Sequence, residues 1–111
     1  MEKVEGKAAF ITGGGSGMGL GMAKAFSAKG MKVVLADLRQ DALDEAMVYF
    51  RDKNLPAHAI RLDVTDRKAY AAAADEAEEV FGKIHVLVNN AGVGTMGPIQ
   101  YSTYNDWDFE V

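Results

Sequence analysis

Four short apolar segments alternate with helical patterns along the chain, and this alternation constrains the fold more than any other feature. The apolar segments span residues 7–12, 32–37, 58–63 and 84–89, and each is expected to form a β-strand. The first, second and fourth are almost continuously apolar, as expected for parallel strands buried on both faces, whereas 58–63 alternates and suits a strand nearer a sheet edge. The order predicts an α/β fold with a right-handed, doubly wound parallel sheet.

Three amphipathic segments lie between these strands and are expected to form the crossover helices. Their apolar stripes comprise Met18, Met22, Ala25 and Phe26; Leu43, Ala46, Met47 and Phe50; and Tyr70, Ala73, Ala74, Ala77, Val80 and Phe81. Gly30 and Gly82 are expected to end helices, and Thr65 to begin one.

Composition predicts one globular domain, spanning residues 1–111. The chain is 49% hydrophobic, carries a net charge of −4 and contains no cysteine, so disulfides and thiolate metal sites are excluded. The acidic balance argues against a nucleic acid or an anionic membrane surface as partner. Because no segment reads as a signal peptide or a membrane span, a cytoplasmic protein is expected.

The stretch "FITGGGSGMG" (10–19) places five glycines between the first strand and the first helix. A tight turn, close backbone approach and a helix N-terminus together predict a diphosphate-binding site. A P-loop is excluded because no Gly-Lys-Ser/Thr ends the stretch. The glycine spacing also fits the S-adenosylmethionine methyltransferases, and an acid at the end of the second strand suits both surviving alternatives.

Two further motifs accompany the glycine stretch. "TGGGSGMG" (12–19), "LDVTD" (62–66) and "NNAG" (89–92), in this order and spacing, resemble the short-chain dehydrogenase/reductase family over essentially the whole chain. The resemblance implies a Rossmann-type sheet with strands in the order 3-2-1-4 and its C-terminal part missing. It also implies hydride transfer between a nicotinamide cofactor and a secondary alcohol or ketone. The segment 97–108 is faintly similar to bacterial members that oxidise benzylic alcohols of lignin-derived aryl ethers.

The resemblance assigns cofactor contacts to the glycine loop. Gly13, Gly17 and Gly19 match the three loop glycines, which provide the tight turn, the close approach to the pyrophosphate and the close helix packing. Ser16 and Met18 lie between them, where backbone N–H groups would face the phosphates.

Asp37 lies 20 residues after Gly17, as the ribose-binding acid should. A carboxylate there accepts hydrogen bonds from the ribose hydroxyls and repels a 2′-phosphate, so NAD is favoured over NADP. Arg39 could instead cradle a 2′-phosphate, and Asp37 could be a mere helix cap.

After the third strand, Asp63 and Val64 match the family's adenine-binding pair. Alternatively, Asp63 caps the helix that begins near Thr65. The residues expected to form a floor beside the adenosine ribose are Asn90, Ala91 and Gly92, whereas Asn89 is expected to stabilise the sheet.

The family's catalytic serine and Tyr-x-x-x-Lys motif have no counterpart here. Tyr49 and Lys53 match the letters but lie in the second helix, so no catalytic residue is assigned, and the 111 residues alone are expected to be inactive. Two hypotheses follow: part of an NAD-dependent oxidoreductase, or a non-catalytic dinucleotide-binding module or subunit completed by another chain. The fourth strand would have a bare apolar outer edge, which favours association, and a homo-oligomer is expected.

Overall fold

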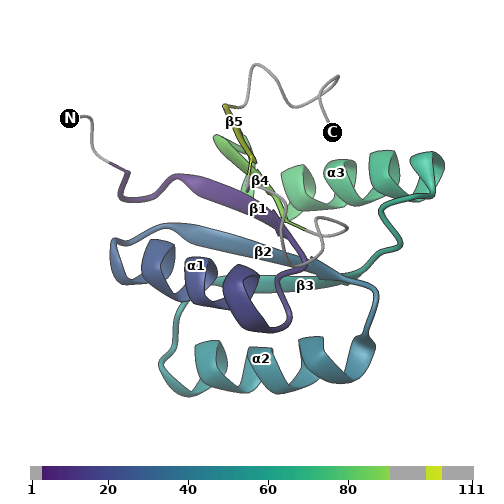
Figure 1. Cartoon of the computed structure of the whole chain (residues 1–111). Helices are drawn as coiled ribbons and strands as arrows, with labels where there is room; N and C mark the ends of the chain where they lie inside the picture. The colour runs from purple at the N-terminus through teal and green to yellow at the C-terminus, as the bar shows by residue number, and fades with distance from the viewer. Residues whose placement is uncertain (1–3, 91–99, 104–111) are drawn as a thin grey trace.

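The structure is a computed structural model, and it describes residues 4–90 and 100–103. Strands and helices alternate along the chain, as the sequence predicts (Figure 1). Their bounds are β1 Ala8–Thr12, α1 Gly17–Ala28, β2 Lys32–Asp37, α2 Gln40–Asp52, β3 Ala57–Arg61, α3 Arg67–Phe81, β4 Val86–Asn89 and β5 Gln100–Thr103.

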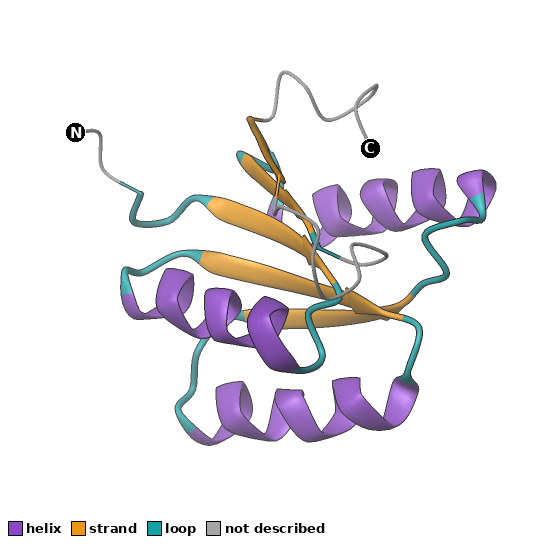
Figure 2. Cartoon of the chain, viewed as in Figure 1, coloured by secondary structure: helices purple, strands orange, loops and turns teal. Residues whose placement is uncertain are grey.

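The five strands form one sheet in the order β3-β2-β1-β4-β5, and β1 to β4 run parallel. Helices α1 and α2 lie on one face of the sheet and α3 on the other (Figure 2). Successive residues of β2 therefore enter different cores: Val33 and Leu35 pack on the α1 and α2 side, whereas Val34 packs on the α3 side. This confirms the doubly wound α/β sheet and the edge position of β3.

Strand β5 was missed by the sequence interpretation. It pairs antiparallel with β4, from Asn89 opposite Gln100 to Val86 opposite Thr103. The expectation that β4 has a bare outer edge is therefore wrong, and the association argument built on that edge falls with it. Tyr101 and Thr103 have high strand propensity, but a four-residue segment is too short to show a period.

Helix α1 packs by a face that matches the expected one only in part, because Met22 and Phe26 lie half-buried against the core on the α1 and α2 side. Its buried residues are Gly19, Ala23 and Ser27, one turn apart, whereas the side chain of Met18 is 63% exposed. Small residues at these positions let the helix approach the sheet closely. The expected faces of α2 and α3 are largely confirmed, with Val80 as an exposed exception.

The boundaries of the helices agree with the glycine signals but not with the expected start of α3. Gly30 and Gly82 follow α1 and α3 with φ of 88° and 80°, a region that favours glycine. Helix α3 begins after Asp66, whose carboxylate accepts the N–H of Ala69 at 3.0 Å, so Asp66 rather than Thr65 is the N-cap.

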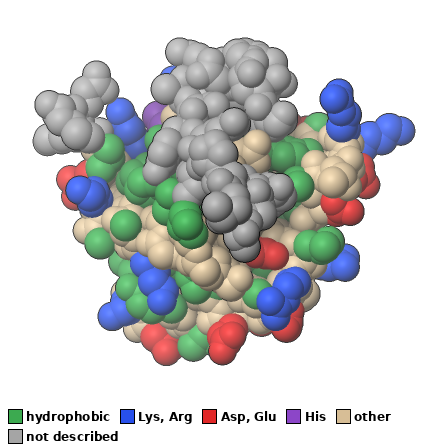
Figure 3. All heavy atoms as spheres, in the orientation of Figure 1, with side chains coloured by type: hydrophobic (Ala, Val, Ile, Leu, Met, Phe, Trp, Pro, Cys, Tyr) green, Lys and Arg blue, Asp and Glu red, His purple; other side chains and the backbone are tan. Residues whose placement is uncertain are grey.

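Charged side chains of both signs are interspersed around the face shown in Figure 3. Within the described residues, no helix combines the length and the apolar character needed to cross a membrane.

Candidate functional site

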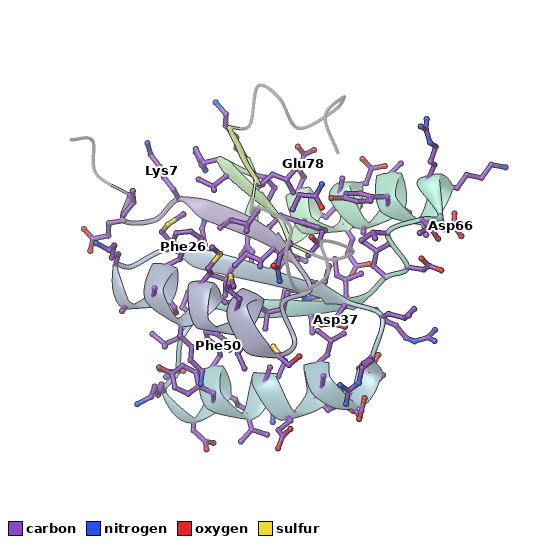
Figure 4. All side chains as sticks on the ribbon, in the orientation of Figure 1. Lys7, Phe26, Asp37, Phe50, Asp66 and Glu78 are labelled. Atoms are coloured by element: carbon purple, nitrogen blue, oxygen red, sulfur yellow. The ribbon has the colours of Figure 1, made fainter. Side chains whose placement is uncertain are left out.

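The candidate site lies where the carboxyl ends of the parallel strands meet. Ligands of open α/β sheets bind at this edge, outside the point where the strand order reverses. Here the reversal falls between β1 and β4, and the glycine loop joins β1 to α1 at that point. Figure 4 labels Asp37 at the end of β2, close to the start of α1.

The three predicted loop glycines are each required by the backbone or by packing. Gly13 and Gly17 have φ of 66° and 58°, where other residues are strained. A Cβ on Gly19 would collide with the carbonyl group of Gly13 and lie 2.9 Å from Nδ2 of Asn90. Gly19 therefore allows α1 to sit directly against the loop and the end of β4.

The N-terminus of α1 presents its backbone N–H groups without a competing side chain. Ser16 is the N-cap, in extended conformation, and its hydroxyl makes no capping hydrogen bond; the first turn carries no acidic residue. Among the described residues, no atom lies within 4 Å of a Cβ added to Gly17, so these residues leave the space above the turn open. Free donors, the positive end of the helix dipole and open space suit an anionic group.

Asp37 is tied to the glycine loop. Its Oδ2 accepts the N–H of Gly15 at 2.9 Å, and its Oδ1 accepts the N–H of Arg39 at 3.1 Å. Each oxygen keeps a second lone pair that an external hydroxyl can use. Asp37 is not the N-cap of α2, because Arg39 occupies that position, so its role as a mere helix cap is excluded.

Gly14 and Gly15 also shape the loop, although the sequence interpretation assigned them no role. The N–H of Gly14 donates to the carbonyl of Ala36 at 3.1 Å. A Cβ on Gly15 would lie 3.0 Å from Oδ2 of Asp37 and 3.1 Å from Cβ of Ala42. The run of three glycines is the sequence signal that could have indicated these positions. Gly13 makes the turn, and Gly14 and Gly15 allow the loop to pack against the end of β2.

Thr12 connects the ends of β1 and β4. Its buried hydroxyl accepts the N–H of Asn90 at 2.8 Å and lies 3.3 Å from both the carbonyl oxygen of Val88 and Oδ1 of Asn89. Thr12 thus fixes Asn90 beside Gly19. The other two residues expected beside the ribose, Ala91 and Gly92, lie outside the described residues.

Asp63 lies after β3, next to the end of β2, because the N–H of Leu62 donates to the carbonyl of Asp37 at 2.8 Å. Its Oδ1 accepts the hydroxyl of Thr65 at 2.7 Å and the N–H of Thr65 at 3.0 Å, and these bonds lower the pKa of Asp63. Asp63 does not cap α3, because Asp66 does. The side chain of Val64 packs against the core on the α3 side.

Arg39 forms an exposed ion pair with Asp41, 3.0 Å from guanidinium nitrogen to carboxylate oxygen. The hydrogen bond and the charge of Asp41 raise the pKa of Arg39. The same hydrogen bond, followed by one from the N–H of Ala42, lowers the pKa of Asp41. Both side chains are therefore fully charged at neutral pH.

Tyr49 and Lys53 lie far from this edge. Tyr49 is ten residues beyond Arg39, or about 15 Å along α2. Two ammonium groups lie over its ring, with Nζ of Lys24 4.3 Å and Nζ of Lys53 5.3 Å from the centroid. The placement is that of a surface cation–π cluster, and it agrees with the rejection of this pair as catalytic.

The two histidines also lie away from the glycine loop. Nε2 of His58 in β3 is 2.7 Å from Oε2 of Glu76 in α3. His85 precedes β4, and its Nδ1 accepts the N–H of Ala8 at 3.2 Å. Burial lowers the pKa of His85, and the charges of three lysines lower it further: Lys7, Lys83 and Lys32.

Comparisons with known proteins agree with this arrangement. The family model described as short chain dehydrogenase matches residues 7–111. The C alpha-dehydrogenase of Sphingobium sp. (strain NBRC 103272 / SYK-6) is 47% identical over 98% of this chain and 36% of its own length. The meso-2,3-butanediol dehydrogenase of Serratia marcescens is 39% identical over 95% of this chain and 41% of its own length. The chain spans less than half the length of these relatives.

Solved structures give the same result. The apo form of LigO from Sphingobium sp. strain SYK-6 superposes with a TM-score of 0.81 at 60% identity, covering 97% of this chain and 40% of that one. A short chain dehydrogenase/reductase from Burkholderia phymatum in complex with NAD superposes with a TM-score of 0.76 at 40% identity, covering 78% of this chain and 31% of that one. Sequence motifs, sheet order and site geometry agree with these matches, and the chain belongs to the short chain dehydrogenase family.

Proposed function

We propose that residues 1–111 form the NAD-binding portion of an oxidoreductase that interconverts a secondary alcohol and a ketone. The observation that supports the proposal is the hydrogen bond between Gly15 and Asp37, which holds the Asp37 carboxylate beside the N-terminus of α1, where it could bind a ribose. The Burkholderia phymatum structure in complex with NAD supports it.

The residues present fit a dinucleotide. The N–H groups around Ser16, Gly17 and Met18 would bind the diphosphate, which the left-handed Gly17 and the open space above it can admit. The cofactor, once bound, supplies a hydride acceptor for the alcohol carbon, while the hydroxyl proton passes to a base.

The adenosine half would lie across the ends of β2, β3 and β4. Asp37 would accept hydrogen bonds from the ribose hydroxyls. Asp63 would meet the adenine amino group: both bonds from Thr65 end on its Oδ1, so among the described residues Oδ2 is available. Asn90, Ala91 and Gly92 would complete the ribose side.

Asp37 also favours NAD over NADP. The 2′-phosphate of NADP would approach a fixed carboxylate whose two oxygens already hold backbone N–H groups. Turning the carboxylate away would break both bonds. The repulsion therefore cannot be relieved by a simple side-chain rotation.

The test is the affinity of the full chain for NADH and NADPH, measured by calorimetry, with Asp37→Asn as the variant. Asparagine keeps the shape and can still accept one of the two backbone N–H groups. Hydrogen bonds to charged groups contribute about 1.5–3 kcal/mol, so NADH should bind about ten-fold more weakly or worse, while discrimination against NADPH decreases.

Asp44→Asn is the matched control, because it removes the same charge from α2, where Asp44 accepts a hydrogen bond from Gln40 at 2.8 Å. It should leave NADH affinity unchanged. Equal NADH affinity in wild type and Asp37→Asn would refute the ribose assignment.

A further inference from the structure

The positive charge of Arg39 could offset the repulsion between the Asp37 carboxylate and the 2′-phosphate of NADP. It lies two residues beyond Asp37, and its charge is close enough for Asp37 to contribute to its raised pKa. A guanidinium near this acid is the group that accommodates a 2′-phosphate in dinucleotide-binding folds. The orientation of the Arg39 side chain therefore bears directly on nucleotide choice.

That orientation is set by Asp41. A guanidinium nitrogen of Arg39 donates to Oδ2 of Asp41 at 3.0 Å. Asp41 lies in the first turn of α2, where the helix dipole favours a negative charge and the N–H of Ala42 adds a hydrogen bond. Asp41 is thus an exposed anion in the first turn of a regular helix, and Arg39 is the N-cap of that helix.

We propose that Asp41 is a positioning residue for nucleotide specificity, because it engages the Arg39 guanidinium and so prevents it from compensating the 2′-phosphate of NADP. This inference rests on the proposed NAD site. Asp37 repels the 2′-phosphate directly. Asp41 binds the Arg39 guanidinium, which would otherwise offset this repulsion. The preference for NAD then depends on two acids, of which only the first would contact the nucleotide.

The experiment compares calorimetric Kd values of the full chain for NADH and NADPH at one fixed salt concentration. Asp41→Asn keeps the side-chain shape but removes the ionic partner of Arg39. Exposed ion pairs have small effects, so NADPH should bind about two- to five-fold more tightly, with the Kd for NADH unchanged. The double variant Arg39→Gln/Asp41→Asn should lose this gain, which shows that the effect passes through Arg39.

Asp44→Asn controls for charge, since it removes one negative charge from α2 without touching Arg39. Its ratio of NADPH to NADH affinity should equal that of the wild type. The proposal is overturned if Asp41→Asn leaves the ratio unchanged, if Asp44→Asn changes it equally, or if the gain persists without Arg39. A wild-type chain that binds neither nucleotide overturns the proposed function itself, whereas normal NADH binding with an unchanged ratio overturns this inference alone.

Discussion

Gly19 and Gly21 lie in the same helix and offer a matched test of why the glycine loop has so little side chain. Both are helical, so alanine should bring each the same gain in helix propensity, about 0.8–1.0 kcal/mol. A Cβ at Gly21 has no atom of the described residues within 4 Å, whereas a Cβ at Gly19 meets the Gly13 carbonyl and Asn90. The difference between the two variants therefore isolates the collision.

The magnitude follows from what the collision would have to move. Gly13 is held in a left-handed conformation, and Asn90 is bound through its N–H to the Thr12 hydroxyl, so neither can shift freely. Overpacking of this kind costs about 1–3 kcal/mol. Gly21→Ala should be more stable than wild type by about 0.5–1 kcal/mol, and Gly19→Ala should be less stable than Gly21→Ala by about 1–3 kcal/mol.

Urea unfolding followed by circular dichroism gives both free energies, and an NADH titration of each variant reports on the loop. Gly19→Ala should also weaken NADH binding, because relief of the collision displaces the phosphate-facing turn, whereas Gly21→Ala should bind normally. Equal stability of the two variants, together with equal NADH affinity, would refute the packing role assigned to Gly19.

The cap of α3 and the side chain of His85 give further predictions, which stability and NADH-binding measurements can test separately. Asp66→Ala should destabilise the protein by about 1 kcal/mol through loss of the α3 cap, while Asp63→Ala should weaken NADH binding with little loss of stability; the reverse pattern in urea unfolding and titration would contradict both assignments. His85, whose folded-state pKa lies below its ordinary value of 6.5, favours its neutral form in the fold, so its contribution is complete above pH 6.5 and is lost as pH falls towards the lowered pKa. Unfolding free energies measured from pH 7.5 to 5 should decline less steeply for His85→Gln than for wild type, and parallel curves would exclude this role.

The sequence was sufficient for the four parallel strands, though not for β5, because the identity of these four depends on local patterns. Continuous apolar runs such as 32–37 can only be buried on both faces, and the alternation in 58–63 marks an edge. The packing face of α1 could be predicted only in part. Met22 packs against the core as expected, whereas Met18 is exposed. The fully buried residues are Gly19, Ala23 and Ser27, because close approach selects small side chains rather than apolar ones.

The candidate site was predicted as a set of residues but not as an arrangement. The loop glycines, Asp37 and Asp63 could be named because motif spacing carries them. The bond from Gly15 to Asp37 spans 22 positions, and the pairing of Arg39 with Asp41 depends on one rotamer. Neither leaves a periodic pattern, so both required the three-dimensional structure.

The hydrogen bond between Gly15 and Asp37 joins the glycine loop to the end of β2, the two segments proposed to bind the diphosphate and the ribose. Segments that become ordered only on binding lose conformational entropy. This loss weakens the affinity, and the ordering step slows formation of the complex. Among the described residues, the glycine loop and Asp37 restrain each other through this bond, and Thr12 restrains Asn90 in the same way. If these residues bind the nucleotide as proposed, they should need little reordering on binding.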